Sequence, residues 1–284
     1  MNNGIASRKI TKLDAYLALP QYMLYRVRSK PTDHIHVFVY GAPRSGTTLM
    51  QVILARHSQF LSIEAETGMF TPSFVLNRSR YWEGERKILI DKCNSTNLVS
   101  LCDEFSLALK THRKEPESTF VEKTPNHVFQ AKLLLKMFPN SYFINMIRDP
   151  RDCYASSLRH PKFEKNPVKF SKYWKKSISK RVKLGPRSNI LDIWYRDLTS
   201  MPETSVSNVM KFLGSNLESQ QIQPGQKSFD SRHKRIEFSK LNKPITSASV
   251  GSYKKELDNK TIKLIEKYSG NYLSIINDRT AYSL

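Results

Sequence analysis

One short loop, residues 41–48, carries side chains that could bind an anion. Its sequence is Gly-Ala-Pro-Arg-Ser-Gly-Thr-Thr, so two glycines, an arginine and three hydroxyl groups lie close together. The backbone N–H groups and hydroxyls of such a loop can donate hydrogen bonds to a phosphate, and the guanidinium adds a positive charge. The loop therefore predicts a binding site for a phosphate-like group.

The elements on either side of this loop would place it at the edge of a sheet. Residues 35–40 are mostly apolar or β-branched, which is typical of a buried parallel strand. After the loop, Leu49, Met50, Ile53 and Leu54 recur at helical spacing. A strand, a glycine-bounded loop and a helix in this order direct the loop amides and the helix N-terminus towards a bound anion.

The spacing nearly matches the phosphate-binding loop of nucleotide hydrolases, in which a lysine follows the second glycine. Thr47 stands at that position here, and the cation within the loop is Arg44. Without the lysine, triphosphate chemistry lacks its charge clamp on the terminal phosphates. The loop is therefore expected to hold a different phosphate-like group. A glycine-containing turn without a ligand is the alternative.

The sequence Pro-Arg-Ser-Gly-Thr-Thr after an apolar strand resembles a loop of the sulfotransferases. In that family the loop holds the 5′-phosphosulfate of 3′-phosphoadenosine 5′-phosphosulfate, the activated sulfate donor. The resemblance implies that this donor is the cosubstrate and that no metal is required. It also implies that the donor-binding residues of the loop are Pro43, Arg44, Ser45, Gly46, Thr47 and Thr48.

A second segment resembles another donor motif of the same family. Residues 142–147 read as a strand, and Arg148 and Asp149 follow it before a predicted helix that contains Ser156. The resemblance implies that Arg148 and Ser156 bind the 3′-phosphate of the donor. A guanidinium fork and a hydroxyl can converge on one phosphate. A surface ion pair between Arg148 and Asp149 is the alternative.

The segment Glu-Lys-Thr-Pro supplies a candidate catalytic lysine. Residues 119–121 read as a strand, so Lys123 would lie at its carboxyl end, where open α/β sheets bind ligands. The resemblance implies that Lys123 contacts the bridging oxygen of the donor, with Arg44 of the loop as a second catalytic cation. Thr124 or Asn126 could cap a helix over residues 128–138. His127 is expected to cap or pack rather than act as a base.

A carboxylate soon after the loop helix is the catalytic base in sulfotransferases similar to the tyrosylprotein and carbohydrate enzymes. Glu66 matches that position, and Glu64 is close enough to be the true match. Both could instead be surface carboxylates. An apolar frame would raise the pKa of the base towards a useful value. The side chains expected to supply this frame are Phe60, Ile63, Met69 and Phe70.

The C-terminal third carries weaker resemblances. Residues 195–198 resemble a structural segment of the family. Residues 249–257 resemble its closing segment, whose backbone and basic groups return to the donor, with Tyr253 in place of the usual tryptophan. Which of three residues contacts the donor remains open: Ser252, Lys254 or Lys255. Residues 258–276 read as one final amphipathic helix.

Length and composition fit one folded domain. The chain has 284 residues, of which 39% are hydrophobic, and its net charge is +21. We expect one three-layer, P-loop-like α/β domain over residues 34–284, with a mainly parallel sheet flanked by helices, after an N-terminal extension over residues 1–33. Three irregularly spaced cysteines argue against a disulfide framework and a zinc site, so each is expected to be buried or half-buried.

The resemblance implies transfer of a sulfuryl group to an acceptor hydroxyl. The large positive charge favours an anionic partner, so the first expectation is a carbohydrate, possibly an acidic glycan, rather than nucleic acid. A tyrosylprotein or a small metabolite is the alternative acceptor. A P-loop-type kinase and a non-catalytic, polyanion-binding module remain alternatives of other classes. The sequence shows no signal peptide or transmembrane anchor, which predicts a cytoplasmic protein, or a soluble lumenal one if an anchor was removed.

Overall fold

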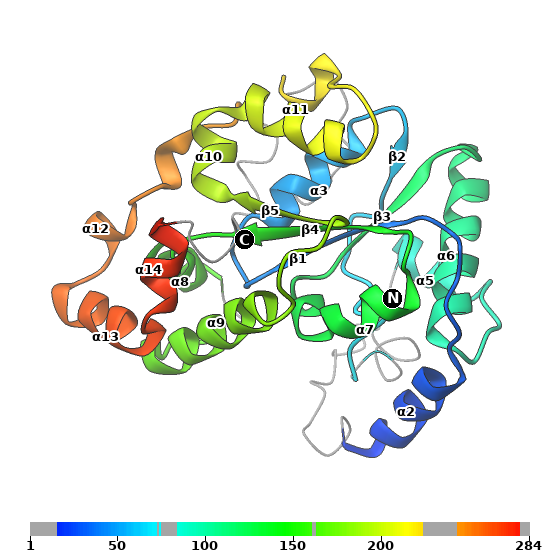
Figure 1. Cartoon of the computed structure of the whole chain (residues 1–284), viewed down its shortest axis with the longest axis horizontal. Helices are drawn as coiled ribbons and strands as arrows, with labels where there is room; N and C mark the ends of the chain where they lie inside the picture. Colours follow the sequence, from blue (N-terminus) through cyan, green and yellow to red (C-terminus); the bar gives the residue numbers. More distant parts are fainter. Residues whose placement is uncertain (1–15, 73, 75–83, 161–162, 224–242, 279–284) are drawn as a thin grey trace, which may run out of the picture.

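The computed structural model describes residues 16–72, 74, 84–160, 163–223 and 243–278. A five-stranded sheet lies at the centre of the molecule, with helices on both of its faces (Figure 1). This arrangement confirms the predicted three-layer α/β fold.

The sheet is parallel at every pairing, in the order β2-β3-β1-β4-β5. The strands are β1 (Val37–Gly41), β2 (Phe60–Leu61), β3 (Thr119–Lys123), β4 (Tyr142–Ile147) and β5 (Ile190–Trp194). Because all strands run the same way, their carboxyl ends share one edge of the sheet. The loop after β1, Lys123 at the end of β3 and Arg148 after β4 must therefore lie at that edge, where such sheets bind ligands.

Alternating residues of β1 face two different cores. Phe38 and Tyr40 belong to one buried cluster, whereas Val37 and Val39 belong to another. The first core is completed by α2 (Leu19–Arg28), α5 (Gly84–Ile90), α6 (Leu98–Arg113) and α7 (Ala131–Met137), and the second by α3 (Thr47–Ala55) and α11 (Pro202–Phe212). A strand that is apolar on both faces is buried on both faces.

A third cluster surrounds Trp174 beyond the carboxyl edge of the sheet. It is formed by α8 (Pro150–Leu158), α9 (Pro167–Val182), α13 (Asn259–Ser269) and α14 (Tyr272–Asp278). The prediction of one helix over residues 258–276 is wrong. Gly270, at a φ of 59°, ends α13 and separates it from α14. This positive φ costs little in glycine, which has no Cβ.

The helix predicted over residues 128–138 is also different. A 3₁₀ helix, η1 (Pro125–Gln130), comes first, and α7 begins at Ala131. The Thr124 side chain does not cap it, because its hydroxyl donates a hydrogen bond to Glu122 instead. The remaining short helices are α10 (Tyr195–Ser200), η2 (Ser219–Gln221), η5 (Ser247–Ser249) and α12 (Tyr253–Glu256).

Within the predicted N-terminal extension, α2 packs on the first core through Tyr22 and Tyr25. The Tyr22 hydroxyl donates to the Phe70 carbonyl at 2.7 Å. Pro20 lies in the first turn of α2, where a proline removes no helical hydrogen bond.

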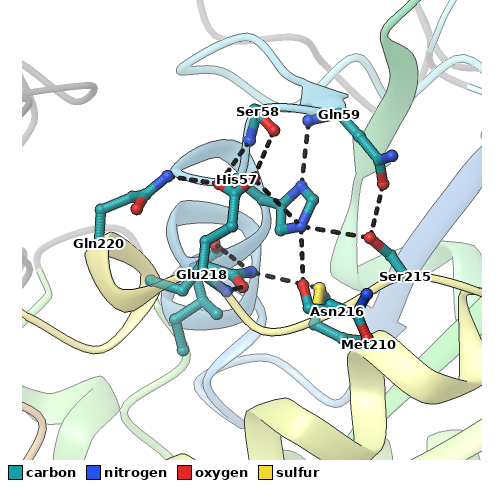
Figure 2. Close-up of polar contacts among 10 residues, drawn as sticks. His57, Ser58, Gln59, Met210, Ser215, Asn216, Glu218 and Gln220 are labelled. Atoms are coloured by element: carbon teal, nitrogen blue, oxygen red, sulfur yellow. Dashed lines mark hydrogen bonds and ion pairs between the residues drawn. The ribbon is translucent and has the colours of Figure 1, made fainter.

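A polar cluster around His57 joins the end of α3 to the segment after α11 (Figure 2). The Gln59 backbone N–H donates to Nδ1 of His57 at 3.0 Å, so the ring proton lies on Nε2. Nε2 lies 2.9 Å from the Asn216 carbonyl, 3.2 Å from Ser215 Oγ and 3.6 Å from Glu218 Oε1. Both ring nitrogens of His57 already have partners, so we interpret the cluster as an anchor for the end of α3 and not as a base that activates Ser215.

Candidate functional site

The loop after β1 is shaped by its two glycines. Gly41 has a φ of 153° and Gly46 a φ of 101°. A Cβ on Gly41 would lie 2.4 Å from the Met146 carbonyl oxygen, and one on Gly46 would lie 2.5 Å from Cδ2 of Tyr195. Side chains at both positions would collide with β4 and α10. The loop therefore lies tightly against the sheet edge and leads directly into the N-terminus of α3 at Thr47.

The two predicted donor motifs meet at this edge. Arg148 donates from NH1 to the Arg44 carbonyl at 3.1 Å, and Arg44 donates from Nε to Ser156 Oγ at 3.2 Å. Arg44, whose φ is 67°, thus directs its guanidinium towards Ser156. The resemblance implies that Arg44 binds the 5′-phosphosulfate. In the structure its side chain contacts Ser156, one of the two residues expected at the 3′-phosphate.

Arg148 is held rigidly. It is 7% exposed, its NH2 donates to the Ser249 carbonyl at 2.8 Å, and its guanidinium lies 4.1 Å from the centre of the Tyr195 ring. Such stacking fixes the plane of the guanidinium, so the N–H groups that remain free to donate point in fixed directions. Tyr195 therefore contacts both Arg148 and the position of Gly46.

Three buried polar atoms near this edge have no hydrogen-bond partner in the part of the chain that the structure describes. They are Ser45 Oγ, Arg148 Nε and Ser252 Oγ. Buried donors are rarely left unpaired, and groups of them commonly mark ligand sites. Their chemistry, two hydroxyls and a guanidinium N–H, fits a phosphorylated ligand.

The C-terminal segment is tied to α8 through Asp152. The backbone N–H groups of Gly251 and Tyr253 donate to its carboxylate at 2.9 and 3.2 Å. Burial raises the pKa of Asp152, although these two hydrogen bonds oppose the rise. Between them lies Ser252, with its buried hydroxyl, whereas Lys254 and Lys255 are exposed.

Glu66 and Lys123 form an ion pair at the same edge. Lys123 Nζ lies 2.8 Å from Glu66 Oε1, and the lysine side chain is 1% exposed, against 50% for the glutamate. The predicted apolar frame around Glu66 is wrong. Its four members lie in the two cores, because the chain turns outwards at Glu66 and leaves the carboxylate at the surface. Glu64 is half-buried.

Tyr173 of α9 lies close enough to Glu66 for the two groups to interact electrostatically. Burial, and to a smaller extent the charge of Glu66, raise the pKa of Tyr173 to about 12. The Tyr173 hydroxyl donates to Asn126, and its ring packs edge-on against Phe129 with the ring centres 5.1 Å apart. His127 is fully buried, which confirms that it packs.

The sequence also makes predictions about the cysteines, a metal site and a membrane anchor. All three cysteines are buried and free, as expected. Within the described ranges, no group of three or more histidine, cysteine, aspartate or glutamate side chains could hold a metal ion. Among the helices of those same ranges, none has the length and apolar character needed to cross a bilayer.

The sequence profile described as the sulfotransferase family matches residues 36–219. The chain belongs to this family. The match extends from β1 to the first residue of η2, so it includes the loop, Glu66, Lys123, Arg148 and Ser156.

Curated relatives of this family member are protein-tyrosine sulfotransferases. Protein-tyrosine sulfotransferase 2 of Gallus gallus is 30% identical over 190 residues, which cover 63% of this chain and 50% of the relative. The Danio rerio protein-tyrosine sulfotransferase 1 is 27% identical over 187 residues, covering 62% and 52%. The chain therefore spans about half the length of the curated relatives it matches.

A solved structure confirms the fold. The sulfotransferase domain of the Synechococcus PCC 7002 olefin synthase superposes with a TM-score of 0.60 at 20% identity, covering 86% of this chain and 96% of that one. Mouse sulfotransferase SULT7A1, solved in complex with adenosine 3′,5′-bisphosphate (PAP), has a TM-score of 0.51 at 13% identity, covering 93% of both chains.

Two residues of the site had no predicted role. Tyr195 was assigned to a structural segment, yet it stacks on Arg148 and dictates a glycine at position 46. Asp152 looked like an ordinary residue of the helix after β4, yet it holds the C-terminal segment. The position of Asp152, one helical turn after Arg148, could have indicated that it holds a neighbouring segment. No sequence pattern could have indicated the role of Tyr195, because its contacts depend on β5 lying next to β4.

Proposed function

We propose that this chain transfers a sulfuryl group from 3′-phosphoadenosine 5′-phosphosulfate to the phenolic hydroxyl of a tyrosyl residue in a protein. The choice of a tyrosyl acceptor is supported by the protein-tyrosine sulfotransferases among its relatives. They favour the tyrosyl alternative over the carbohydrate that was expected first. Membership of the family supports the reaction type. The cytoplasmic location stays a prediction.

The observation that carries the proposal is the meeting of the two donor motifs beside the Glu66–Lys123 pair. One edge of the sheet thus carries cationic side chains that can bind an anionic donor and a carboxylate that can accept a proton. The bound donor supplies an activated sulfuryl group. Arg148, Ser156 and Arg44 would bind its 3′-phosphate, while the loop amides and the hydroxyls of Thr47 and Thr48 would bind its 5′-phosphosulfate.

The transfer itself forms one S–O bond and breaks another. As the acceptor oxygen approaches sulfur, Glu66 accepts the hydroxyl proton. The bond between sulfur and the bridging oxygen of the 5′-phosphate breaks, and Lys123 stabilises the charge that develops on that oxygen. The products are a tyrosine sulfate ester and adenosine 3′,5′-bisphosphate.

Tyr173, whose pKa is raised by burial and by the charge of Glu66, packs its ring edge-on against Phe129. Edge-to-face packing would favour a further aromatic ring, such as that of a tyrosyl acceptor, beside this pair.

The test is an acceptor panel with ³⁵S-labelled donor. A tyrosine-containing peptide, its phenylalanine counterpart, a glycosaminoglycan and a small phenol are each incubated with the purified chain. We expect label on the tyrosine peptide and none on the phenylalanine peptide. Label on the glycosaminoglycan alone would replace the acceptor, and label on no acceptor, with no release of adenosine 3′,5′-bisphosphate, would contradict the proposal.

A further inference from the structure

A buried carboxylate, Glu122, lies one residue before the catalytic lysine and has no role in the reaction above. It is 1% exposed, on β3, where it pairs in register with Phe38 of the central strand. A buried charge is costly unless it is hydrogen-bonded. Its partners therefore show what the charge is used for.

Three side chains surround this carboxylate. The hydroxyls of Thr67 and Thr124 both donate to Oε1 at 2.7 Å, and Nδ1 of His127 lies 2.8 Å from Oε2. Burial alone would raise the pKa of Glu122, but His127 and the two hydroxyls hold it below its ordinary value. The carboxylate is thus a buried anion that accepts both threonine hydroxyls at Oε1 and lies beside the His127 ring at Oε2.

Each of these partners in turn accepts a backbone N–H from the segment that follows Glu66. Gly68 N–H donates to Thr124 Oγ1 at 3.0 Å, Met69 N–H to Thr67 Oγ1 at 3.2 Å, and Phe70 N–H to His127 Nε2 at 3.3 Å. Three consecutive amides are therefore held through side chains whose own orientation is set by Glu122, because a hydroxyl that donates to the carboxylate presents its lone pairs to the amide.

We propose that Glu122 is a positioning residue that fixes the backbone of residues 67–70 and thereby holds Glu66 against Lys123. The proposal rests on the proposed function, in which Glu66 is the base. The Glu66 side chain is half exposed and pairs with Lys123, so its place depends on the backbone that carries it. Successive residues of β3 then act together: Lys123 contacts the carboxylate, and Glu122 orders the chain that carries it.

Matched substitutions at the two threonines separate this role from simple packing. Thr124→Val and Thr67→Val keep the shape but remove a hydroxyl that joins Glu122 to an amide. Thr124→Ser and Thr67→Ser keep that hydroxyl. Val209→Ala, on α11 in the second core, lowers stability without touching these hydrogen bonds and controls for destabilisation. Two valine variants are used, so that the test survives if one of them does not fold.

We expect each valine variant to lower kcat about tenfold or more, since misplacing a catalytic group by about 1 Å can cost about 10²-fold. The Kd for adenosine 3′,5′-bisphosphate should stay at the wild-type value, and amide hydrogen exchange at residues 68–70 should accelerate. Both serine variants and Val209→Ala should keep the wild-type kcat.

An unchanged kcat in the valine variants, with faster exchange at residues 68–70, would overturn the positioning role. Equal losses in the valine and serine variants, or in Val209→Ala, would also overturn it. Wild-type protein that transfers no sulfuryl group would instead overturn the proposed function, so the wild-type assay tells the two failures apart.

Discussion

At the scale of single residues, the site depends on charges that are held at fixed places. Arg148 is stacked on Tyr195 and bonded to two carbonyls, and Lys123 is almost fully buried. Buried, oriented cations stabilise developing negative charge without reorganising at the moment of reaction. Glu66 differs, because its carboxylate is half exposed and can meet an acceptor that arrives from solvent.

Glu66→Gln should abolish most turnover and leave donor binding intact. The amide keeps the shape and an acceptor oxygen for Lys123, but it cannot take the hydroxyl proton, and general bases typically contribute about 10²–10⁴-fold. The kcat is measured with labelled donor, and the Kd for adenosine 3′,5′-bisphosphate by titration. Glu64→Gln serves as the matched control and should behave like wild type. If instead Glu64→Gln loses turnover and Glu66→Gln keeps it, the base is Glu64.

Sequence patterns could predict the residues whose place follows from a strand end. Lys123 and Arg148 lie directly at or after buried strands, and parallel strands bring their carboxyl ends together. The exposure of Glu66 could not be predicted, since it depends on how residues 64–70 leave the core. Tyr195 was missed for a similar reason: its ring reaches the loop only because β5 lies next to β4.

At the scale of elements, the donor loop is confined by its neighbours. Gly46 directly precedes α3 and has a left-handed backbone. It lies against the ring of Tyr195, the first residue of α10. The C-terminal segment closes the other side through Asp152 of α8. The loop is therefore a rigid cradle formed by β1, β4, α8 and α10 together.

Gly46→Ala should impair donor binding and stability together. A left-handed non-glycine residue costs about 1–3 kcal/mol, and the new Cβ would also lie 2.5 Å from Tyr195 Cδ2. Gly214→Ala is the matched control, since Gly214 also has a positive φ, 72°, but no atom lies within 4 Å of the Cβ position. Thermal unfolding and donor titration are compared for both. An equal effect of the two substitutions would show that Tyr195 does not confine the loop.

Helix boundaries were the least predictable elements. The pattern over residues 258–276 is amphipathic throughout, yet Gly270 divides the helix in two. The prediction missed this division because the spacing of apolar residues does not reveal a turn between two helices. The 3₁₀ start at Pro125 likewise depends on the buried contact of His127 with Glu122. Such contacts join residues from different elements and leave no local signal.

At the scale of the whole molecule, one sheet edge gathers the loop, Lys123 and Arg148, while the His57 cluster anchors the chain just before β2. The chain as a whole carries a net charge of +21, which favours anionic donors and acidic acceptors alike. Charge alone attracts many anions, so we expect selectivity for the donor to come from the two proposed sites for its 3′- and 5′-phosphates.

Isothermal titration calorimetry with adenosine 3′,5′-bisphosphate and adenosine 5′-monophosphate tests this selectivity most directly. Wild-type protein should bind the bisphosphate more tightly. Arg148→Ala should weaken the bisphosphate by about 1.5–3 kcal/mol, the worth of a hydrogen bond to a charged group, and leave the monophosphate nearly unchanged. Arg159→Ala, which removes an exposed arginine paired with Glu256, should change neither affinity. Equal weakening of both nucleotides by Arg148→Ala, or wild-type protein that binds neither, would contradict the account.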